Sequence, residues 1–320
     1  MSRPAIGYAF HREFDPSEVV THARRAEELG YDEFWVIEDC FFSAGVTLAA
    51  AALTATEAIT VGIGIAPAVA RNPAITAMEF ATLARLAPGR FHGGIGHGVQ
   101  SWMAQMGVRP ASPLTALDET ITAVRALLHG ERVSVEGRYV TLNDVALQPA
   151  PAQPPLVSAG VRGPKSLALA GRVADGTIMA DFCNADYVRW ARTQIATDNH
   201  RVTVLASMGV GLDEEARSGC REGMGFHLAE VAQDAPISLR MAPFFADLEA
   251  RAEQVGWVEA AQGLSAADWA TVGAVGSPDD AAGYIRSMAE AGTDAITFFP
   301  SPFQPLDDAE TLARTVFPLL

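Results

Sequence analysis

The sequence predicts an α/β protein, a (β/α)8 barrel formed by one chain of 320 residues. Three observations support this fold class. Short and nearly unbroken apolar segments alternate with segments of helical pattern, about eight such apolar segments can be counted, and the chain length suits a barrel of ~250 residues with an addition. Strands that are buried on both faces of a parallel sheet have this apolar character. An open, doubly wound sheet is the alternative fold.

The predicted elements follow one another in regular order. Pro16, just inside the first helix, and Gly30, just beyond its end, are typical helix boundaries. The expected strands cover 5–10, 33–38, 59–66, 90–96, 155–160, 175–180, 201–211 and 294–300, with a polar hairpin at 133–142. The expected helices lie between 15 and 30, at 46–56, after Asn72-Pro73, at 117–128, 165–171, 187–196 and 277–292, and at the C-terminus.

The alternation stops between residues 212 and about 272, where the sequence is compatible only with helix. It resumes at Ser277, which precedes Pro278 as a helix cap. We therefore expect a single barrel domain over residues 1–320, with an insertion at about 212–272. Aromatic residues of the insertion could line a lid over a substrate, although aromatic residues at helical spacing more often belong to a core. These are Phe244, Phe245, Trp257 and Trp269.

The composition argues for small-molecule partners. The net charge is −15 and the pI is about 4.8, which disfavours nucleic acid and anionic membranes, because both require basic surfaces. The N-terminus lacks a secretory signal pattern, so we expect a cytoplasmic protein. Cys40, Cys183 and Cys220 are widely spaced without a C-x-x-C motif, which predicts neither a disulfide framework nor a structural zinc site.

The segment 33–38 ends in polar groups, which is unusual for a buried strand. Glu38, Asp39 and Cys40 follow directly on its apolar residues. In a barrel, the carboxyl ends of the strands and the loops after them build the active site, where a desolvated carboxylate can carry a proton or accept a hydrogen bond. These three residues are therefore the candidate catalytic residues. The alternative is that Glu38 or Asp39 caps the following helix.

Glycines gather at the ends of two further predicted strands. The run HGGIGHG does not match the dinucleotide fingerprint G-x-G-x-x-G, so a Rossmann site is rejected. Gly96, His97 and Gly98 remain candidates for a place where a flat ligand lies against backbone, the alternative being a tight turn. In the preceding strand, Gly62 and Gly64 indicate a close approach or a bend.

The loop SAGVRGPKS predicts an anion-binding site. Free N–H groups in the first turn of the helix, with Arg162 and Lys165 nearby, would form a cradle for the phosphate of a cofactor. The alternative is that Gly-Pro simply begins a helix. The candidate cofactor-binding residues of this loop are Ala159, Gly160, Val161, Arg162, Gly163, Pro164 and Lys165.

Two other site types are poorly supported. No G-x-S-x-G motif occurs, which argues against a nucleophile-elbow hydrolase. A metal site formed by His92, His97 and Asp39 is conceivable, but their spacing has no ligand signature, so no metal is predicted.

Three segments, EFWVIED, ARNPAITAMEFATLARLAPGRFHGGIGHG and GPKSLALAGRVADGTIM, resemble the bacterial luciferase-like superfamily of (β/α)8 oxidoreductases. The resemblance is strongest to the coenzyme F420-dependent branch that includes methylenetetrahydromethanopterin reductase. It implies a flavin or deazaflavin ring in the barrel mouth, with a phosphate near the SAGVRGPKS loop. It also implies a non-prolyl cis peptide bond in the third strand, here between Gly64 and Ile65, and often a homodimer.

The chain departs from this family at two positions. Where many F420 enzymes have Asp-His, this sequence has Asp39-Cys40, and the acid that often follows the G-x-G-x-G loop is here Val99. Asp39 matches the retained position and is the leading candidate for hydrogen bonding to the ring or the substrate. Cys40, Glu38, His11 and His97 are weaker candidates. Cys40 is expected to be pocket wall rather than a nucleophile, because no basic residue adjoins it.

The expected function is a coenzyme F420-dependent oxidoreductase that transfers a hydride between the deazaflavin C5 and a small organic substrate held under the insertion. The leading alternative is a monooxygenase that uses reduced FMN and oxygen. A non-catalytic flavin-binding protein of the same fold is a third possibility, compatible with the missing Asp-His pair.

Overall fold

The computed structural model describes residues 3–180 and 182–320 and confirms the α/β barrel class. Nine strands form one sheet; eight of them close into the ring of a TIM barrel, and the ninth pairs with one of these eight. Helices alternate with the strands along the chain, so the open doubly wound alternative is wrong. The chain divides into two compact units. One comprises 1–8, 179–193 and 202–320, and the other comprises 9–178 and 194–201.

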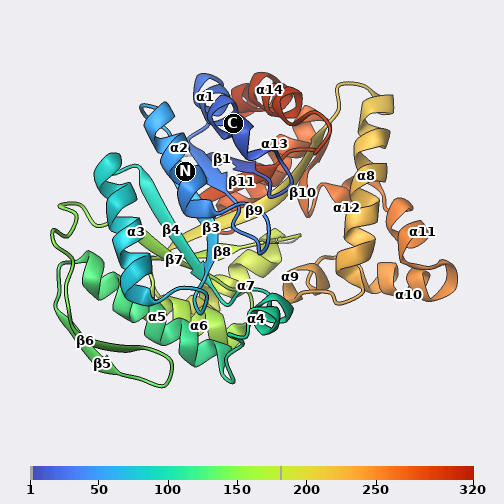
Figure 1. The fold of residues 1–320 in the computed structure, drawn as a ribbon. Coiled ribbons are helices and arrows are strands. Elements are labelled where there is room, and N and C mark those ends of the chain that lie inside the picture. Colours follow the sequence, from blue (N-terminus) through green and yellow to red (C-terminus); the bar gives the residue numbers. More distant parts are fainter. Residues whose placement is uncertain (1–2, 181) are drawn as a thin grey trace. The chain divides into compact units, whose positions relative to one another are not determined.

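The unit that contains residues 9–178 holds the first part of the strand series. Its strands are almost wholly buried, as their apolar sequences predict. Their spatial order is β2 (Glu33–Val36), β3 (Thr60–Pro67), β4 (Phe91–Gly96), β7 (Leu156–Gly160) and β8 (Gly176–Met179). The helices of this unit, labelled in Figure 1, are α1 (Val19–Glu28), α2 (Gly45–Ala55), α3 (Pro73–Leu86), α4 (Gln100–Gln105), α5 (Pro113–Leu128) and α6 (Pro164–Val173).

The register of this sheet brings the carboxyl ends of its strands together. Gly96, the last residue of β4, is paired with Pro67 on one side and with Gly160 on the other. The register between β3 and β4 shifts between Ile63 and Ala66, so β3 is irregular close to its carboxyl end. Segments that follow these strands therefore begin at neighbouring points.

The unit that contains residues 202–320 holds most of the residues of the remaining strands. Their order is β10 (Gly273–Gly276), β9 (Arg201–Val210), β11 (Ala295–Phe299) and β1 (Ala5–Phe10). Strand β10 was not predicted from the sequence. The four-residue segment GAVG is too short, and its side chains are too small, to give a recognisable strand pattern. Tertiary pairing determines it, because Gly273 to Gly276 pair with Ser207 to Val210 of β9.

The stretch expected to be an insertion consists mainly of helices. These are α8 (Glu214–Ala232), α9 (Ile237–Arg240), α10 (Phe245–Val255), α11 (Trp257–Gln262) and α12 (Ala266–Trp269), and Figure 1 shows α8, α10 and α11 grouped together. Phe244, Phe245 and Trp269 are buried in their shared hydrophobic cluster, and Trp257 packs against it. These aromatic residues therefore form a core, which is the more common role of aromatic residues at helical spacing.

Helix boundaries differ from expectation where capping decides them. Helix α5 begins at Pro113 rather than at Leu117, because the Ser112 hydroxyl accepts a hydrogen bond from the Thr115 N–H and proline suits the first helical position. Helix α4 was not predicted, since its N-cap, Val99, provides no side-chain cap. The hairpin of β5 (Val133–Glu136) and β6 (Thr141–Val145) is confirmed.

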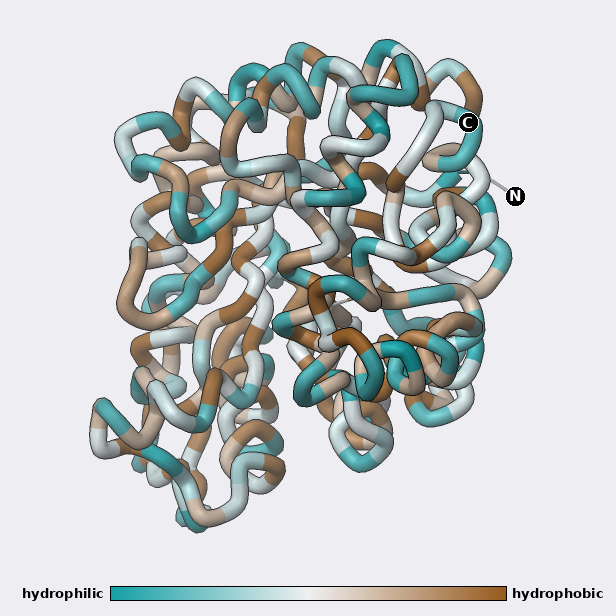
Figure 2. The backbone as a smooth tube through the Cα atoms, turned by 90° about the vertical axis from the view of Figure 1, so that its right-hand side faces the viewer, coloured by the Kyte–Doolittle hydropathy of each residue, from teal (hydrophilic) through white to brown (hydrophobic). Residues whose placement is uncertain are grey.

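The remaining helices also follow the expected order. They are α7 (Ala185–Ile195), α13 (Pro278–Glu290) and α14 (Pro305–Thr315), and α13 has the predicted Ser277 cap with its Asp280 partner. Figure 2 shows many of the hydrophilic residues in outer loops and helices, and hydrophobic residues along interior segments. Among the described residues, the structure contains no helix of the length and apolar character that crossing a membrane requires.

Candidate functional site

The structure brings most of the predicted site residues to the carboxyl ends of four neighbouring strands, β2, β3, β4 and β7. Asp39 lies in the loop after β2, Gly64 and Ile65 lie near the carboxyl end of β3, and Gly96 ends β4. The segment from Ala159 to Lys165 includes the last residues of β7, the loop after it and the first residues of α6. Because these strands are sequential neighbours in the sheet, residues far apart in the sequence share one end of it.

Glu38 is held in a network rather than left open to a ligand. Its side chain is 8% exposed, and its carboxylate forms a two-point ion pair with Arg71, with Nη2 3.0 Å from Oε2. The same Oε2 accepts a hydrogen bond from the backbone N–H of Gly45, the first residue of α2, at 2.8 Å. Since the N-cap residue, Ala44, provides no side-chain cap, Glu38 performs that task. Glu38 therefore caps helix α2, as the alternative interpretation of this residue predicted.

Asp39 is more accessible and has a different partner. Its Oδ2 lies 2.8 Å from Nη1 of Arg12, which follows β1, and the two side chains are 27% and 34% exposed. The Arg12 guanidinium also lies over the ring of Phe42, 5.1 Å from its centroid. Arg12 and Arg71 were missed in the sequence. Both follow a predicted strand closely, and that position is the signal that could have identified them.

Cys40 does not have the environment of a nucleophile. Burial, together with the neighbouring carboxylates of Glu38 and Asp39, raises the pKa of the Cys40 thiol above its ordinary value, against the opposing effect of Arg71. The thiolate is the reactive form, so the side chain stays a protonated thiol near neutral pH. The Cys40–Phe41 peptide bond is cis, a feature that was not expected.

The Gly64–Ile65 peptide bond is cis, as the family resemblance implied. The half-buried Ile65 side chain lies against two of the strand-end glycines. A Cβ added at Gly96 would lie 2.6 Å from Ile65 Cδ1, and one added at Gly160 would lie 2.8 Å from Ile65 Cγ2. These glycines therefore make room first for Ile65, whereas a ligand was expected to lie directly on their backbone. In the same strand, Gly62 leaves room for the Trp35 indole.

His97 uses both ring nitrogens within the protein. Nδ1 lies 3.2 Å from the Pro113 carbonyl oxygen, and Nε2 lies 3.0 Å from the Ser166 hydroxyl oxygen. Burial lowers the pKa of His97, although the hydrogen bond to Pro113 opposes this effect. The adjacent Gly98 has φ +67°, a left-handed conformation that favours glycine. His97 therefore links the loop after β4 to the starts of α5 and α6.

The start of α6 has the donors that an anion requires. Its N-cap residue, Gly163, provides no side-chain hydrogen bond, and Pro164 occupies the first helical position. The first-turn N–H groups of Lys165 and Ser166 are therefore available at the positive end of the helix, beside the exposed side chains of Arg162 and Lys165. This donor set fits a phosphate group.

The metal alternative lacks a ligand cluster. In residues 3–180 and 182–320, no group of three His, Cys, Asp or Glu side chains is arranged to hold a metal ion. Nε2 of the buried His92 lies 2.7 Å from the Ser158 hydroxyl, while His97 and Asp39 have the partners described above.

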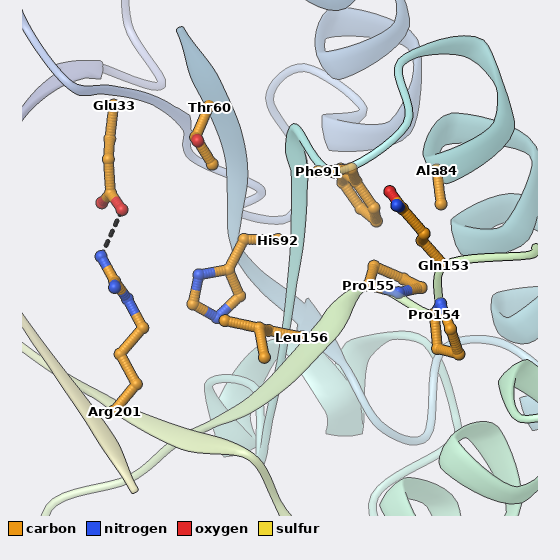
Figure 3. Close-up of a pocket in the computed structure, with 11 residues that line it drawn as sticks. Glu33, Thr60, Ala84, Phe91, His92, Gln153, Pro154, Pro155, Leu156 and Arg201 are labelled. Atoms are coloured by element: carbon orange, nitrogen blue, oxygen red, sulfur yellow. Dashed lines mark hydrogen bonds and ion pairs between the residues drawn. The ribbon is translucent and has the colours of Figure 1, made fainter.

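A small cavity of about 180 Å³ lies at the opposite ends of the same strands (Figure 3). Glu33 and Arg201 form an ion pair in its wall, and Glu33 also accepts a hydrogen bond from Trp35 Nε1 at 2.8 Å. Burial, followed by the Arg201 charge, lowers the pKa of His92 to about 3. Glu33 is paired with Arg201 and Trp35, His92 is paired with Ser158, and the region lies at the amino ends of the strands, so we assign it to stability.

Comparisons with known proteins identify the family and the fold of the chain. The model of the family described as luciferase-like monooxygenase matches residues 3–295. A 5,10-methylenetetrahydromethanopterin reductase from Methanolobus tindarius is 35% identical over 176 residues, which are 53% of this chain and 53% of that relative. The aligned region thus spans about half the length of that curated relative.

Two further likenesses extend over nearly the whole chain. An F420-dependent hydroxymycolic acid dehydrogenase from Mycobacterium tuberculosis is 27% identical over 97% of this chain and 86% of its own length. The solved structure of a coenzyme F420-dependent tetrahydromethanopterin reductase from Methanopyrus kandleri superposes with a TM-score of 0.80, covering 99% of each chain at 22% identity. At that identity the superposition shows the fold alone, and that fold is the barrel.

Proposed function

Because the chain belongs to the luciferase-like monooxygenase family, we propose that it is an F420-dependent oxidoreductase. It transfers a hydride between the deazaflavin C5 and a small organic substrate. One observation carries the choice of cofactor: the alignment over 97% of the chain with a dehydrogenase whose name specifies F420. A glucose-6-phosphate dehydrogenase that matches about half of the chain is also named as F420-dependent, which supports the same cofactor.

The residues at the strand ends suit the two parts of such a cofactor. The first-turn N–H groups of α6, with Arg162 and Lys165, hold the phosphate. Ile65, backed by Gly96 and Gly160, provides a partly exposed apolar surface for the ring. When bound, the deazaflavin supplies the hydride chemistry, and the protein supplies binding and orientation.

Asp39 is the residue that we assign to proton handling. Its Oδ2 is engaged by Arg12, and in the part of the chain that the structure describes Oδ1 has no side-chain partner. Oδ1 therefore accepts a hydrogen bond or a proton from the substrate. The Glu38–Arg71 pair fixes the preceding residue, and Cys40 remains a protonated wall residue.

A monooxygenase that uses reduced FMN is the second candidate, because the matching family model is described by that activity. The same phosphate-binding helix would serve FMN. The non-catalytic alternative rests on Cys40 and Val99, which replace two polar positions of related enzymes. We also infer a homodimer from the resemblance to this family.

Cofactor titration tests the proposal. Purified apoprotein is titrated with F420, FMN and reduced FMN while cofactor or protein fluorescence is followed. We expect F420 to bind at least tenfold more tightly than FMN, a difference of ~1.4 kcal/mol. Tight binding of FMN without a response to F420 would contradict the proposal and favour the monooxygenase. A protein that binds F420, yet turns over no alcohol, aldehyde or ketone with either redox form, would favour the non-catalytic alternative.

A further inference from the structure

We propose that His97 is a positioning residue that secures the first turn of α6 for the cofactor phosphate and makes no contact with the cofactor itself. The inference rests on the proposed function, since it concerns the same phosphate site. It assigns a specific role to a residue that the sequence suggested only as one of several cofactor contacts.

The hydrogen-bonding pattern determines the tautomer of His97. The Pro113 carbonyl oxygen can only accept, so Nδ1 must carry the proton and donate it over 3.2 Å. Burial lowers the pKa of His97, so the ring is neutral near pH 7 and Nε2 is an acceptor. The Ser166 hydroxyl then donates to Nε2 over 3.0 Å. Both ring nitrogens are occupied, and none is left to bind a phosphate.

The first turn of α6 lacks a local anchor of its own. Gly163 has no side chain to cap the helix, a Cβ placed on it would meet nothing within 4 Å, and Pro164 has no N–H to donate. Ser166 lies in this turn, and its hydroxyl is tied to His97. The hydrogen bond therefore connects a loosely capped helix start to the loop after β4.

His97 is itself held firmly, which makes it a suitable anchor. The Gln100 side-chain amide donates to the carbonyl oxygens of His97 at 3.1 Å and Gly98 at 3.3 Å. The Nδ1 bond reaches Pro113, the first residue of the long helix α5. Strand β4, α5 and the first turn of α6 are thus joined through one imidazole. A preorganised turn binds an anion more tightly, because less ordering remains to be done on binding.

The experiment compares ligands that differ only in the phosphate tail. Dissociation constants are measured for F420 and for its tail-free deazaflavin riboside, and likewise for FMN and riboflavin, with wild type, His97→Leu and His97→Gln. We expect His97→Leu to weaken the binding of the phosphorylated ligand about tenfold, which is the equivalent of one or two hydrogen bonds. The binding of the tail-free ligand should weaken by less than about twofold. His97→Gln retains one donor and one acceptor and should recover most of the affinity.

Two controls complete the design. Ser166→Ala keeps the backbone N–H but removes the hydroxyl, so it should weaken the binding of the phosphorylated ligand. In the double variant with His97→Leu, it should cause little further loss of affinity. His129→Leu is the matched control, because His129 also bonds a backbone carbonyl but lies just beyond the far end of α5, ~24 Å away by helix length. It should leave all four dissociation constants unchanged.

Each result distinguishes the proposal from its rivals. Equal losses for phosphorylated and tail-free ligands would show a general structural role and overturn the proposal. Losses in His97→Gln as large as in His97→Leu would indicate direct contact with the phosphate and also overturn it. If FMN rather than F420 is the cofactor, the FMN and riboflavin pair still tests His97, so failure of the proposed function is seen separately.

Discussion

The Arg71 guanidinium meets the Glu38 carboxylate through both of its terminal nitrogens, next to the Asp39–Cys40 turn. Glu38 is 8% exposed, and Arg71 also approaches Glu79 at 3.4 Å. The pair joins the end of β2, the start of α2 and the segment before α3. A candidate catalytic turn is thus supported by a nearly buried ion pair that does no chemistry itself.

Replacing Arg71 with methionine should destabilise the protein by about 2–3 kcal/mol, because it leaves the Glu38 carboxylate buried without its charged partner. The free energy of unfolding in urea at pH 7 measures this. The double variant with Glu38→Gln should regain part of the loss. Arg132→Met is the control, since Arg132 and Asp144 form an exposed pair at 3.0 Å and should contribute less than about 1 kcal/mol. Equal losses at Arg71 and Arg132 would contradict this account.

Replacing Asp39 with asparagine should reduce kcat by about a hundredfold, the usual range for removing a general acid or base, while F420 affinity changes little. Cys40→Ser is the matched neighbour and should retain turnover within about threefold, because burial and the neighbouring carboxylates raise the pKa of the Cys40 thiol and disfavour the reactive thiolate. Steady-state kinetics and thermal unfolding are measured together. A Cys40→Ser variant as impaired as Asp39→Asn would place the chemistry on the thiol instead.

His92 should make the protein less stable in acid. The pKa of His92 is lowered to about 3 in the folded state, against 6.5 for an ordinary histidine, so the unfolded chain binds the proton first. The stabilisation is complete above pH 6.5 and is lost as the pH falls from there towards 3. Relative to His92→Leu, the wild type should lose up to ~1.4 kcal/mol per pH unit in this window.

Urea denaturation at pH 7, 6 and 5 measures that difference. His129→Leu serves as the control, because it removes an exposed histidine instead of a buried one. Parallel stability curves for wild type and His92→Leu would show that His92 titrates alike in both states, contrary to the prediction.

Much of the fold was predictable because it depends on local pattern. The apolar strands and their helices follow from hydrophobic periodicity, and Ser277 with Asp280 caps α13 as its sequence indicates. Strand β10 was missed because four small residues carry no pattern until β9 pairs with them. Helix α4 was missed because it lacks a capping residue.

The site was predictable in position but not in detail. The sequence placed Asp39, Gly64, Gly96 and the Gly163 loop at strand ends, and these strands are neighbours. It could not show that Ile65 would fill the space left by Gly96 and Gly160, because that contact depends on how three strands align.

Apart from β10 and α4, the sequence alone determined the order of strands and helices, because strands buried on both faces must be apolar. It also determined which end of the sheet carries the polar residues, because connected parallel strands end at one side. Which polar side chains pair with one another was decided only by the tertiary structure. Glu38 pairs with Arg71 across 33 residues, and His97 with Ser166 across 69. Side-chain contacts over such separations arise from packing geometry, which no local pattern encodes.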